Sequence, residues 1–255
     1  MATYPVTEQT KANRYAERAS YDAPLIHSIL LASPLTHVSF IPPSTSPDSP
    51  PTHPSTLPML TALAPSPSSP SEKVIYLHGS SLSRLTKLCS TPSGLPVTLS
   101  TTLLDGYVLA LSPFSHSVNY RSAVIFGRAH LVTSREEILA AMEAITNRLV
   151  PSRWENSRVP PTESEIKATG VLRVEIEGAS AKVRRGGAHS ERRDLKDEGV
   201  RGRVWTGVVP VWEEMGQGVE GGDNEVGDVP GYIEGWVRGE NGRRRAWAEE
   251  GAVDE

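Results

Sequence analysis

The chain has 255 residues, of which 38% are hydrophobic and 22% are charged, and its formal net charge is −4. This length suffices for one large domain or two small ones with a buried core, and the small charge argues against general attraction to nucleic acid or anionic membranes. No apolar run approaches the roughly 20 residues that cross a bilayer, and the N-terminus has no apolar signal core, so we expect a cytoplasmic protein. The single Cys89 excludes an internal disulfide and a multi-cysteine zinc site, and we interpret it as a small buried hydrophobe.

The first third of the chain combines helical segments, one strand and a stretch rich in proline and serine. Apolar spacing over 9–32, interrupted by Pro24, predicts two short helices. Ten of the thirty residues in 42–71 are Pro and eight are Ser, so we expect flexible insertions at about 42–56 and 64–72. Between them 57–63 predicts a short strand, which Pro58 confines to an edge or a strand start.

The rest of the chain reads mainly as strands. The predicted strands cover 37–41, 74–78, 96–104, 107–111, 122–132, 171–177 and 203–211. Asp105-Gly106 is a strong hairpin signal between two of them, and Gly127 is a candidate bulge. A helix capped by Thr133 or Ser134 is predicted to end before Pro151, and a shorter one is predicted near 163–169. Because the strands do not alternate with helices as βαβ units, we expect a mainly β fold with accessory helices, a barrel or a sandwich.

The last part of the chain is polar and rich in glycine. We expect partial disorder over 186–200 and 216–228, and a short helix near 232–238. The run Arg243–Arg245 is best interpreted as solvated charge rather than a nucleic-acid site, because acidic residues surround it. The segment Gly216–Gly221 matches the bare dinucleotide-binding pattern, but no strand and helix flank it as that motif requires.

Two short segments carry residues that suggest a binding site. In the first, the 74–78 strand ends in Gly79, and Ser80, Ser81 and Arg84 follow at a predicted helix start. Backbone N–H groups, two hydroxyls and a guanidinium could converge there on a phosphate. The alternative is an ordinary serine-capped helix with a surface arginine.

The second segment places Arg121 and Ser122 at the opening of a strand that is otherwise made of core residues. Polar groups at the mouth of a barrel often serve a ligand, although a plain surface strand start would look the same in sequence.

The order of these motifs resembles a known family. Ile75-Tyr-Leu-His-Gly-Ser80, Leu104-Asp-Gly106, Asn119-Tyr-Arg-Ser122 and Phe126-Gly-Arg-Ala129 follow one another as in the flavoproteins similar to pyridoxamine 5'-phosphate oxidase, which bind flavin mononucleotide (FMN). The nitroimidazole-resistance branch is the nearest group. The resemblance implies an FMN-binding antiparallel split β-barrel over 1–212, followed by a polar extension over 213–255 with a short helix. It also implies a homodimer, whereas the expectation of no nucleic-acid partner and no membrane rests on the charge and the short apolar runs described above.

The resemblance further implies roles for individual residues. Leu77 and His78 would line the flavin ring, with His78 as the candidate catalytic residue, and Gly79, Ser80, Ser81 and Arg84 would meet the phosphate. Arg121 and Ser122 would face the flavin, and Lys182 and Trp205 would approach it from later strands. The strand 37–41 lacks the Arg and Lys of true pyridoxamine phosphate oxidases, which argues against that particular activity.

Three functions therefore remain open. The first is an FMN-dependent oxidoreductase acting on an unidentified small molecule, in which the flavin carries the hydride chemistry. The second is a binding module without turnover that holds flavin or haem, with a histidine as axial ligand. The third is a dimeric scaffold whose pocket no longer binds a cofactor.

Overall fold

The computed structural model describes residues 2–44 and 53–253. The chain forms two compact units, one made of Met1–Thr101 and Ser122–Ala181 and the other of Thr102–Arg121 and Lys182–Glu255. Three long antiparallel-style strands contribute residues to both units, namely β6 (Leu95–Leu109), β7 (Ser117–Leu131) and β8 (Thr169–Arg184).

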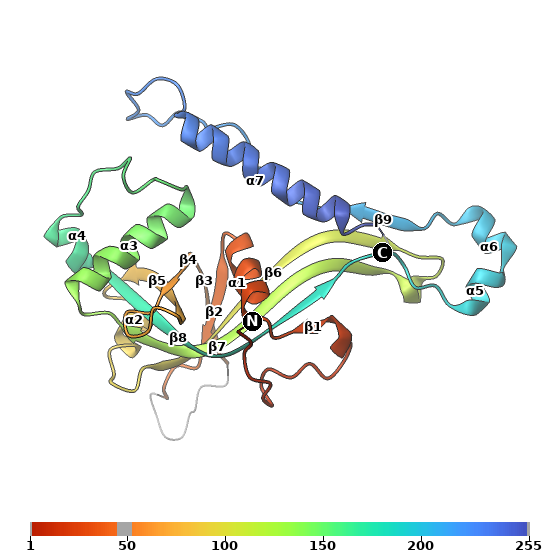
Figure 1. The fold of residues 1–255 in the computed structure, drawn as a ribbon, viewed down its shortest axis with the longest axis horizontal. Coiled ribbons are helices and arrows are strands. Elements are labelled where there is room, and N and C mark those ends of the chain that lie inside the picture. The colour runs from red at the N-terminus through yellow and green to blue at the C-terminus, as the bar shows by residue number, and fades with distance from the viewer. Residues whose placement is uncertain (1, 45–52, 254–255) are drawn as a thin grey trace. The chain divides into compact units, whose positions relative to one another are not determined.

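The first unit contains most of the remaining elements (Figure 1). They are the 3-10 helix η1 (Ala16–Arg18), β1 (Ala19–Ser20), α1 (Ala23–Ala32), β2 (Thr36–Phe40), β3 (Ser55–Met59), β4 (Thr61–Pro65), β5 (Lys73–Ser80), α2 (Arg84–Leu88), α3 (Arg135–Leu149) and α4 (Glu163–Ala168). The expected helix at 163–169 and the helix capped by Ser134 are confirmed. Asp22 caps α1, and Pro24 lies in its first turn, where a missing N–H costs nothing, rather than between two helices.

The strands of the described residues form a sheet with the order β3-β2-β6-β7-β8-β5-β4, with β1 beside β8 and β9 beside β6. Every register that is resolved in it is antiparallel. The edge strands β3 and β4 lie at opposite ends of this order, yet only Leu60 separates them in the chain. The sheet must therefore curl until its two ends meet, and a buried hydrogen bond of 3.1 Å between the hydroxyls of Thr36 and Thr61 joins β2, the neighbour of one edge strand, to the other edge strand β4. The expected mainly β, split-barrel type of fold is confirmed.

One core of the first unit lies between α3 and the sheet. Tyr76 of β5 and Val171 of β8 pack in a buried cluster with Ala141 and Ile145 of α3. Ala141 and Ile145 are four residues apart and so lie on one face of the helix. This packing explains why the 135–149 pattern was readable from the sequence as an amphipathic helix.

Asp105-Gly106 is not a hairpin turn, which corrects the prediction. Both residues lie inside β6, and the chain reverses instead at Ala110–His116, where η2 (Pro113–Ser115) lies. The buried side of β6 alternates regularly from Leu95 to Asp105 and then changes parity at Gly106, which is typical of a bulge. A Cβ on Gly106 would lie 2.9 Å from a Val208 methyl carbon, so glycine permits the close approach of β9.

Three further expectations need correction. The expected strand at 57–63 is two strands, β3 and β4, and part of each predicted insertion is ordered: Ser55 pairs with Phe40, and Ser66 N–H donates to Glu72 C=O at 2.9 Å. Residues 45–52 of the first insertion lie outside the described part. The loop expected over 186–200 contains the start of a helical pair.

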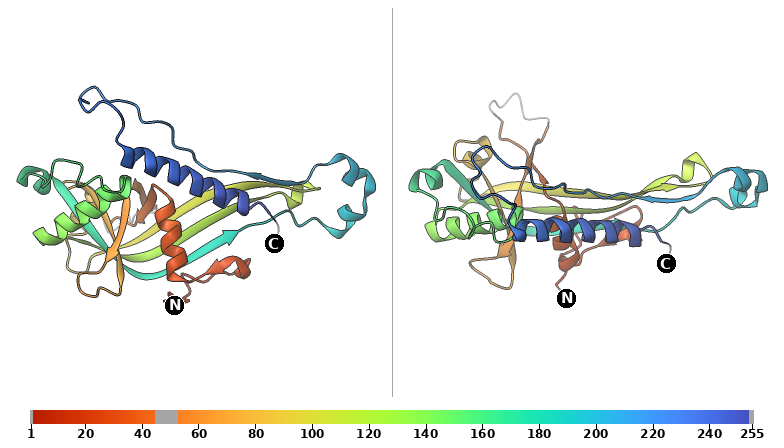
Figure 2. Two further views of the ribbon diagram at one scale, coloured as in Figure 1. Left: turned by 45° about the horizontal axis from the view of Figure 1, so that its top comes forward. Right: turned by 90° about the horizontal axis from the view of Figure 1, so that it is seen from above.

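The second unit adds α5 (Arg192–Lys196), α6 (Glu198–Arg203), β9 (Gly207–Pro210) and α7 (Gly231–Glu250). The predicted short helix near 232–238 is in fact α7, which continues without interruption for 20 residues (Figure 2). The expected extension over 213–255 as a separate domain stays a prediction. Among the described residues, no helix is both long and apolar enough to span a membrane.

Candidate functional site

The first predicted segment lies where β5 ends, but its local structure differs from the prediction. β5 continues through His78, Gly79 and Ser80, which pair with Val171, Gly170 and Thr169 of β8. The helix does not open at Gly79: α2 begins at Arg84, with Ser83 as its cap, and has only five residues. The segment after Gly79 is therefore the end of a strand followed by a turn. Its Gly and Ser residues resemble a helix start in the sequence, but pairing with β8 keeps them in the strand.

Most backbone N–H groups of this turn already have partners. Ser81 N–H donates to Ala168 C=O at 2.9 Å, and Ser83 N–H donates to Ser80 C=O at 3.0 Å. Leu82 N–H donates to the Ser80 hydroxyl at 3.2 Å. The proposed cradle of free backbone donors is therefore wrong for these three positions, and any anion bound here would be held by side chains.

The side chains of the turn divide into buried and exposed sets. Leu77 is fully buried in the core, on the opposite side of β5 from the exposed His78 and Ser80. Within the described part of the chain, the His78 ring, the Ser81 hydroxyl and the Arg84 guanidinium form no hydrogen bond or ion pair. His78, Gly79 and Ser80 thus lie at the end of β5, and Ser81 and Arg84 follow in the turn and at the start of α2. Leu77 could contribute to a ligand site only through its backbone.

Two residues that the sequence did not single out fix the shape of this turn. The Thr86 hydroxyl donates to Ser80 C=O at 3.0 Å and accepts from the Ser83 hydroxyl at 2.9 Å. A Cβ on Gly170 would lie 2.5 Å from the Thr86 methyl carbon, so only glycine lets β8 pass this close to α2. Thr86 therefore fixes the shape of the turn, and Gly170 makes room for it. The sequence does not reveal this contact, because Thr86 lies in a predicted helix and Gly170 at the start of a distant strand.

Partial burial lowers the pKa of His78 below its ordinary value, because the charged imidazolium is less well solvated than in water. Among the described residues, no carboxylate offsets this effect. Desolvation thus favours the neutral imidazole, the form that can accept a proton or bind a metal.

We expect NMR titration of the His78 ring protons to give a pKa below 6.5. Between the folded-state pKa and 6.5, the folded protein then binds fewer protons at His78 than the unfolded chain does. The free energy of unfolding therefore rises with pH through this window. His78→Gln should remove that part of the pH dependence of unfolding. A His78 pKa at or above 6.5 would contradict this assignment.

Arg121 and its neighbours form a buried charged cluster in the second unit. Arg121 donates to both carboxylate oxygens of Asp105, with Nε–Oδ2 at 2.9 Å and Nη2–Oδ1 at 2.8 Å. Its guanidinium also lies 4.3 Å from the ring centroid of Trp247 in α7, and Trp247 Nε1 donates to Asp105 Oδ2 at 3.3 Å. Arg121 was expected to face a ligand at a strand opening, but here it holds Asp105 and Trp247 together.

The other predicted residues are dispersed. Ser122 follows Arg121 on the opposite side of β7 and is half-buried in the first unit. Lys182 is half-buried near the end of β8, and Trp205 is 64% exposed ahead of β9. The Trp205 ring covers Gly207, where a Cβ would lie 2.6 Å from it. Roles for Ser122, Lys182 and Trp205 stay predictions.

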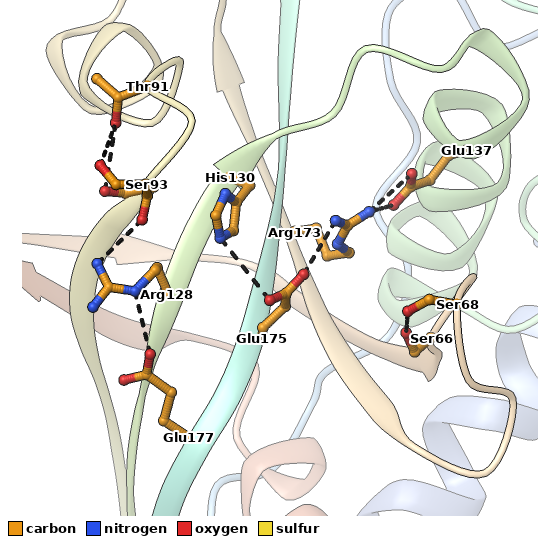
Figure 3. Close-up of polar contacts among 11 residues, drawn as sticks. Ser66, Ser68, Thr91, Ser93, Arg128, His130, Glu137, Arg173, Glu175 and Glu177 are labelled. Carbon is orange, nitrogen blue, oxygen red and sulfur yellow. Dashed lines mark hydrogen bonds and ion pairs between the residues drawn. The ribbon is translucent and has the colours of Figure 1, made fainter.

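A second polar cluster lies on β7 and β8 of the first unit (Figure 3). Arg173 forms two ion pairs, one from Nη1 to Glu137 Oε1 of α3 at 2.9 Å and one from Nη2 to Glu175 Oε1 at 3.2 Å. His130 Nε2 lies 4.0 Å from Glu175 Oε2. Tyr76 donates to Glu137 at 3.0 Å, and burial raises the Tyr76 pKa. Because these groups satisfy one another, the cluster attaches α3 to the sheet rather than offering free ligand contacts.

The fold and the site define a protein of the split-barrel class with a polar strand end on β5. The model of the pyridoxamine 5'-phosphate oxidase family matches residues 22–183, and the chain belongs to this family. No curated protein matches the chain at a significant level.

Solved structures extend the comparison over nearly the whole chain. A flavocytochrome from Azotobacter vinelandii is 28% identical, with a TM-score of 0.72, and the match covers 90% of this chain and 97% of that one. An FAD- and heme-binding protein from Mycobacterium smegmatis is 25% identical, with a TM-score of 0.70, over 86% and 97% of the two chains.

Proposed function

We propose that this protein binds a flavin nucleotide, with the phosphate held at the end of β5 by the side chains of Ser81 and Arg84. Membership of the pyridoxamine 5'-phosphate oxidase family supports a flavin, as does the likeness to a flavocytochrome and to an FAD- and heme-binding protein over most of the chain. The observation that carries the site is the exposed Arg84 guanidinium, which has no partner among the described residues and belongs to the residue that begins α2. It follows the turn that contains Ser81, and the Thr86 hydroxyl fixes that turn by donating to Ser80 C=O.

The chemistry of the site would be that of an oxidoreductase with an unidentified small substrate. A bound flavin supplies hydride transfer, and the protein supplies binding, orientation and exclusion of water. His78 is the candidate catalytic residue, because a neutral imidazole at the strand end can accept a proton or donate a hydrogen bond to a developing charge. FMN, the initial expectation, and FAD both carry the phosphate group that Arg84 would meet.

Haem is a second candidate at the same strand end. The His78 ring forms no hydrogen bond or ion pair with the described residues, and desolvation favours its neutral form, which a ligand of haem iron requires. Of the two structural relatives described above, one is a flavocytochrome and the other is an FAD- and heme-binding protein. A flavin and a haem in one chain would make the protein a redox module with or without turnover of its own substrate.

The visible absorption spectrum of the purified protein tests both candidates, because flavin and haem absorb differently. Cofactor released by acid and separated chromatographically distinguishes FMN from FAD. His78→Ala is expected to lose any haem while Arg84→Ala keeps it. A colourless protein that takes up no added flavin or haem would refute the proposal, and haem that survives His78→Ala would refute the axial role.

We also expect a homodimer. Family flavin sites lie between subunits, and the edge strands β3 and β4 and exposed apolar side chains such as Tyr107 leave surface to cover. Static light scattering at micromolar concentration should give twice the chain mass of 27.6 kDa. A stable monomer would count against shared flavin sites.

A further inference from the structure

A cavity in the second unit has no part in the proposed function. It lies between the segment 214–218 and α7 and has a volume of about 680 Å³, which is within the range of small-molecule sites. Its lining contains the apolar side chains of Met215, Val229, Ile233 and Val237. All lining residues fall within 214–241, so one unit builds the whole cavity. We call it the α7 cavity.

The wall opposite α7 is fixed by hydrogen bonds rather than by regular structure. The Asn241 side chain of α7 accepts from Met215 N–H at 2.9 Å and donates to Met215 C=O at 2.8 Å. An ion pair next to this wall, between Glu213 Oε2 and Arg244 Nη1 of α7 at 3.2 Å, holds the same segment against the helix. A wall that is held in place before binding lowers the entropy cost of ordering a ligand.

Glycine at position 216 leaves part of the cavity unfilled. A Cβ built on Gly216 meets no heavy atom within 4 Å, and the backbone there adopts a conformation that other residues also adopt. A larger side chain could therefore enter the cavity without a steric clash or backbone strain. This property offers a way to block the cavity while leaving its walls intact.

The charge around the cavity is predominantly negative. The segment 213–230 contains six Asp or Glu residues and no Lys or Arg, and one of the six, Glu213, is paired with Arg244 of α7. The rim carries Glu214, Glu234 and Arg238, and in the described part of the chain neither Glu234 nor Arg238 forms a hydrogen bond or an ion pair through its side chain. Two acidic residues and one arginine line the cavity. Because Glu214 also interacts with Arg245, Glu234 is the carboxylate that would attract a cation to the rim.

We propose that the α7 cavity binds a small amphipathic monocation, an alkylammonium or arylammonium compound. The apolar body would lie against Met215, Ile233 and Val237, and the ammonium group would lie at the rim beside the Glu234 carboxylate. The apolar part of the ligand thus contacts apolar side chains and its charged part contacts a carboxylate. Binding at this cavity requires neither flavin nor haem.

Isothermal titration calorimetry with octylammonium, octanol and octanoate tests the proposal, since the three probes share one alkyl chain and differ in charge. Octylammonium is expected to bind one site per chain, at least tenfold more tightly than octanol or octanoate. Glu234→Gln is expected to weaken octylammonium about tenfold, as the loss of one charge-assisted contact does.

Gly216→Leu and Gly222→Leu form a matched pair, because both positions have open space around a Cβ but only Gly216 lines the cavity. Gly216→Leu should weaken octylammonium at least tenfold, and Gly222→Leu should leave it unchanged. Equal binding by both variants, tighter binding of octanoate, or no saturable binding would each overturn the proposal. The exposed Glu234→Gln variant decides the matter if Gly216→Leu does not fold, and the cofactor spectrum, which reports the β5 site, should not change in any variant.

Discussion

Replacing Arg121 with leucine is expected to lower the free energy of unfolding by about 3–5 kcal/mol. The side chains of Arg121 and Asp105 are only 11% and 6% exposed, and Arg121 makes paired hydrogen bonds to the carboxylate. Without the guanidinium, Asp105 stays buried with a charge, and among the described side chains only the Trp247 N–H still donates to it. The uncompensated charge, rather than the lost attraction, accounts for most of the expected cost. Urea unfolding of both proteins measures it.

Two further variants separate a buried pair from a general loss of packing. Arg128→Leu removes an arginine from a pair with Glu177 whose side chains are 37% and 55% exposed, and it should cost less than about 1 kcal/mol. Asp105→Leu combined with Arg121→Leu should regain most of the stability, short of roughly 1 kcal/mol for the hydrogen bond lost by Trp247. A double variant no more stable than Arg121→Leu would contradict this explanation.

The sequence was informative where one element decides its own structure. The 135–149 helix could be predicted because Ser134 caps it and its apolar residues share one face that packs on the sheet. The prediction of a hairpin turn at Asp105-Gly106 was wrong, because contacts with residues distant in sequence outweigh the local preference for a turn. Asp105 is drawn into an ion pair with Arg121, and Gly106 lets β9 approach. Neither partner is visible in a window of a few residues.

The length of α7 was underestimated for a similar reason. Four glycines at 235, 239, 242 and 231 weaken the intrinsic helix signal, since each costs about 1 kcal/mol relative to alanine. The helix is instead held by contacts distant in sequence, such as Trp247 with Asp105 and Asn241 with Met215. Gly251 C=O, just after the helix, accepts from the Asn119 side chain at 3.0 Å and from Gly186 N–H at 2.8 Å.

The location of the candidate site at the end of β5 stays a prediction, whereas its expected local structure was wrong. His78 and Ser80 lie in β5, and Arg84 begins α2 only after a turn. The sequence could not show that Ser81 N–H is used by Ala168, because that contact joins β5 to the end of α4. It also could not show that Arg121 is committed to Asp105, since a buried and a ligand-facing arginine look alike at a strand opening.

Replacing Arg84 with alanine is expected to weaken FMN binding by roughly ten- to a hundredfold. The backbone N–H groups of Ser81, Leu82 and Ser83 already have partners, so they offer a phosphate little. Arg84 is the only Lys or Arg in the segment 78–84, so it would supply the full positive charge. A charge-assisted contact of this kind contributes about 1.5–3 kcal/mol. Titration of flavin fluorescence with each protein measures the difference.

Riboflavin is the control for this prediction, because it shares the flavin ring but lacks the phosphate. It should bind the wild-type protein and Arg84→Ala about equally, and Lys87→Ala, one turn further along α2, should leave FMN affinity unchanged. If riboflavin lost as much affinity as FMN, the variant would have disturbed the turn rather than removed a phosphate contact. Unchanged FMN affinity in Arg84→Ala would show that the phosphate is bound elsewhere. A phosphate-specific loss confined to Arg84 follows only if this guanidinium faces the bound nucleotide.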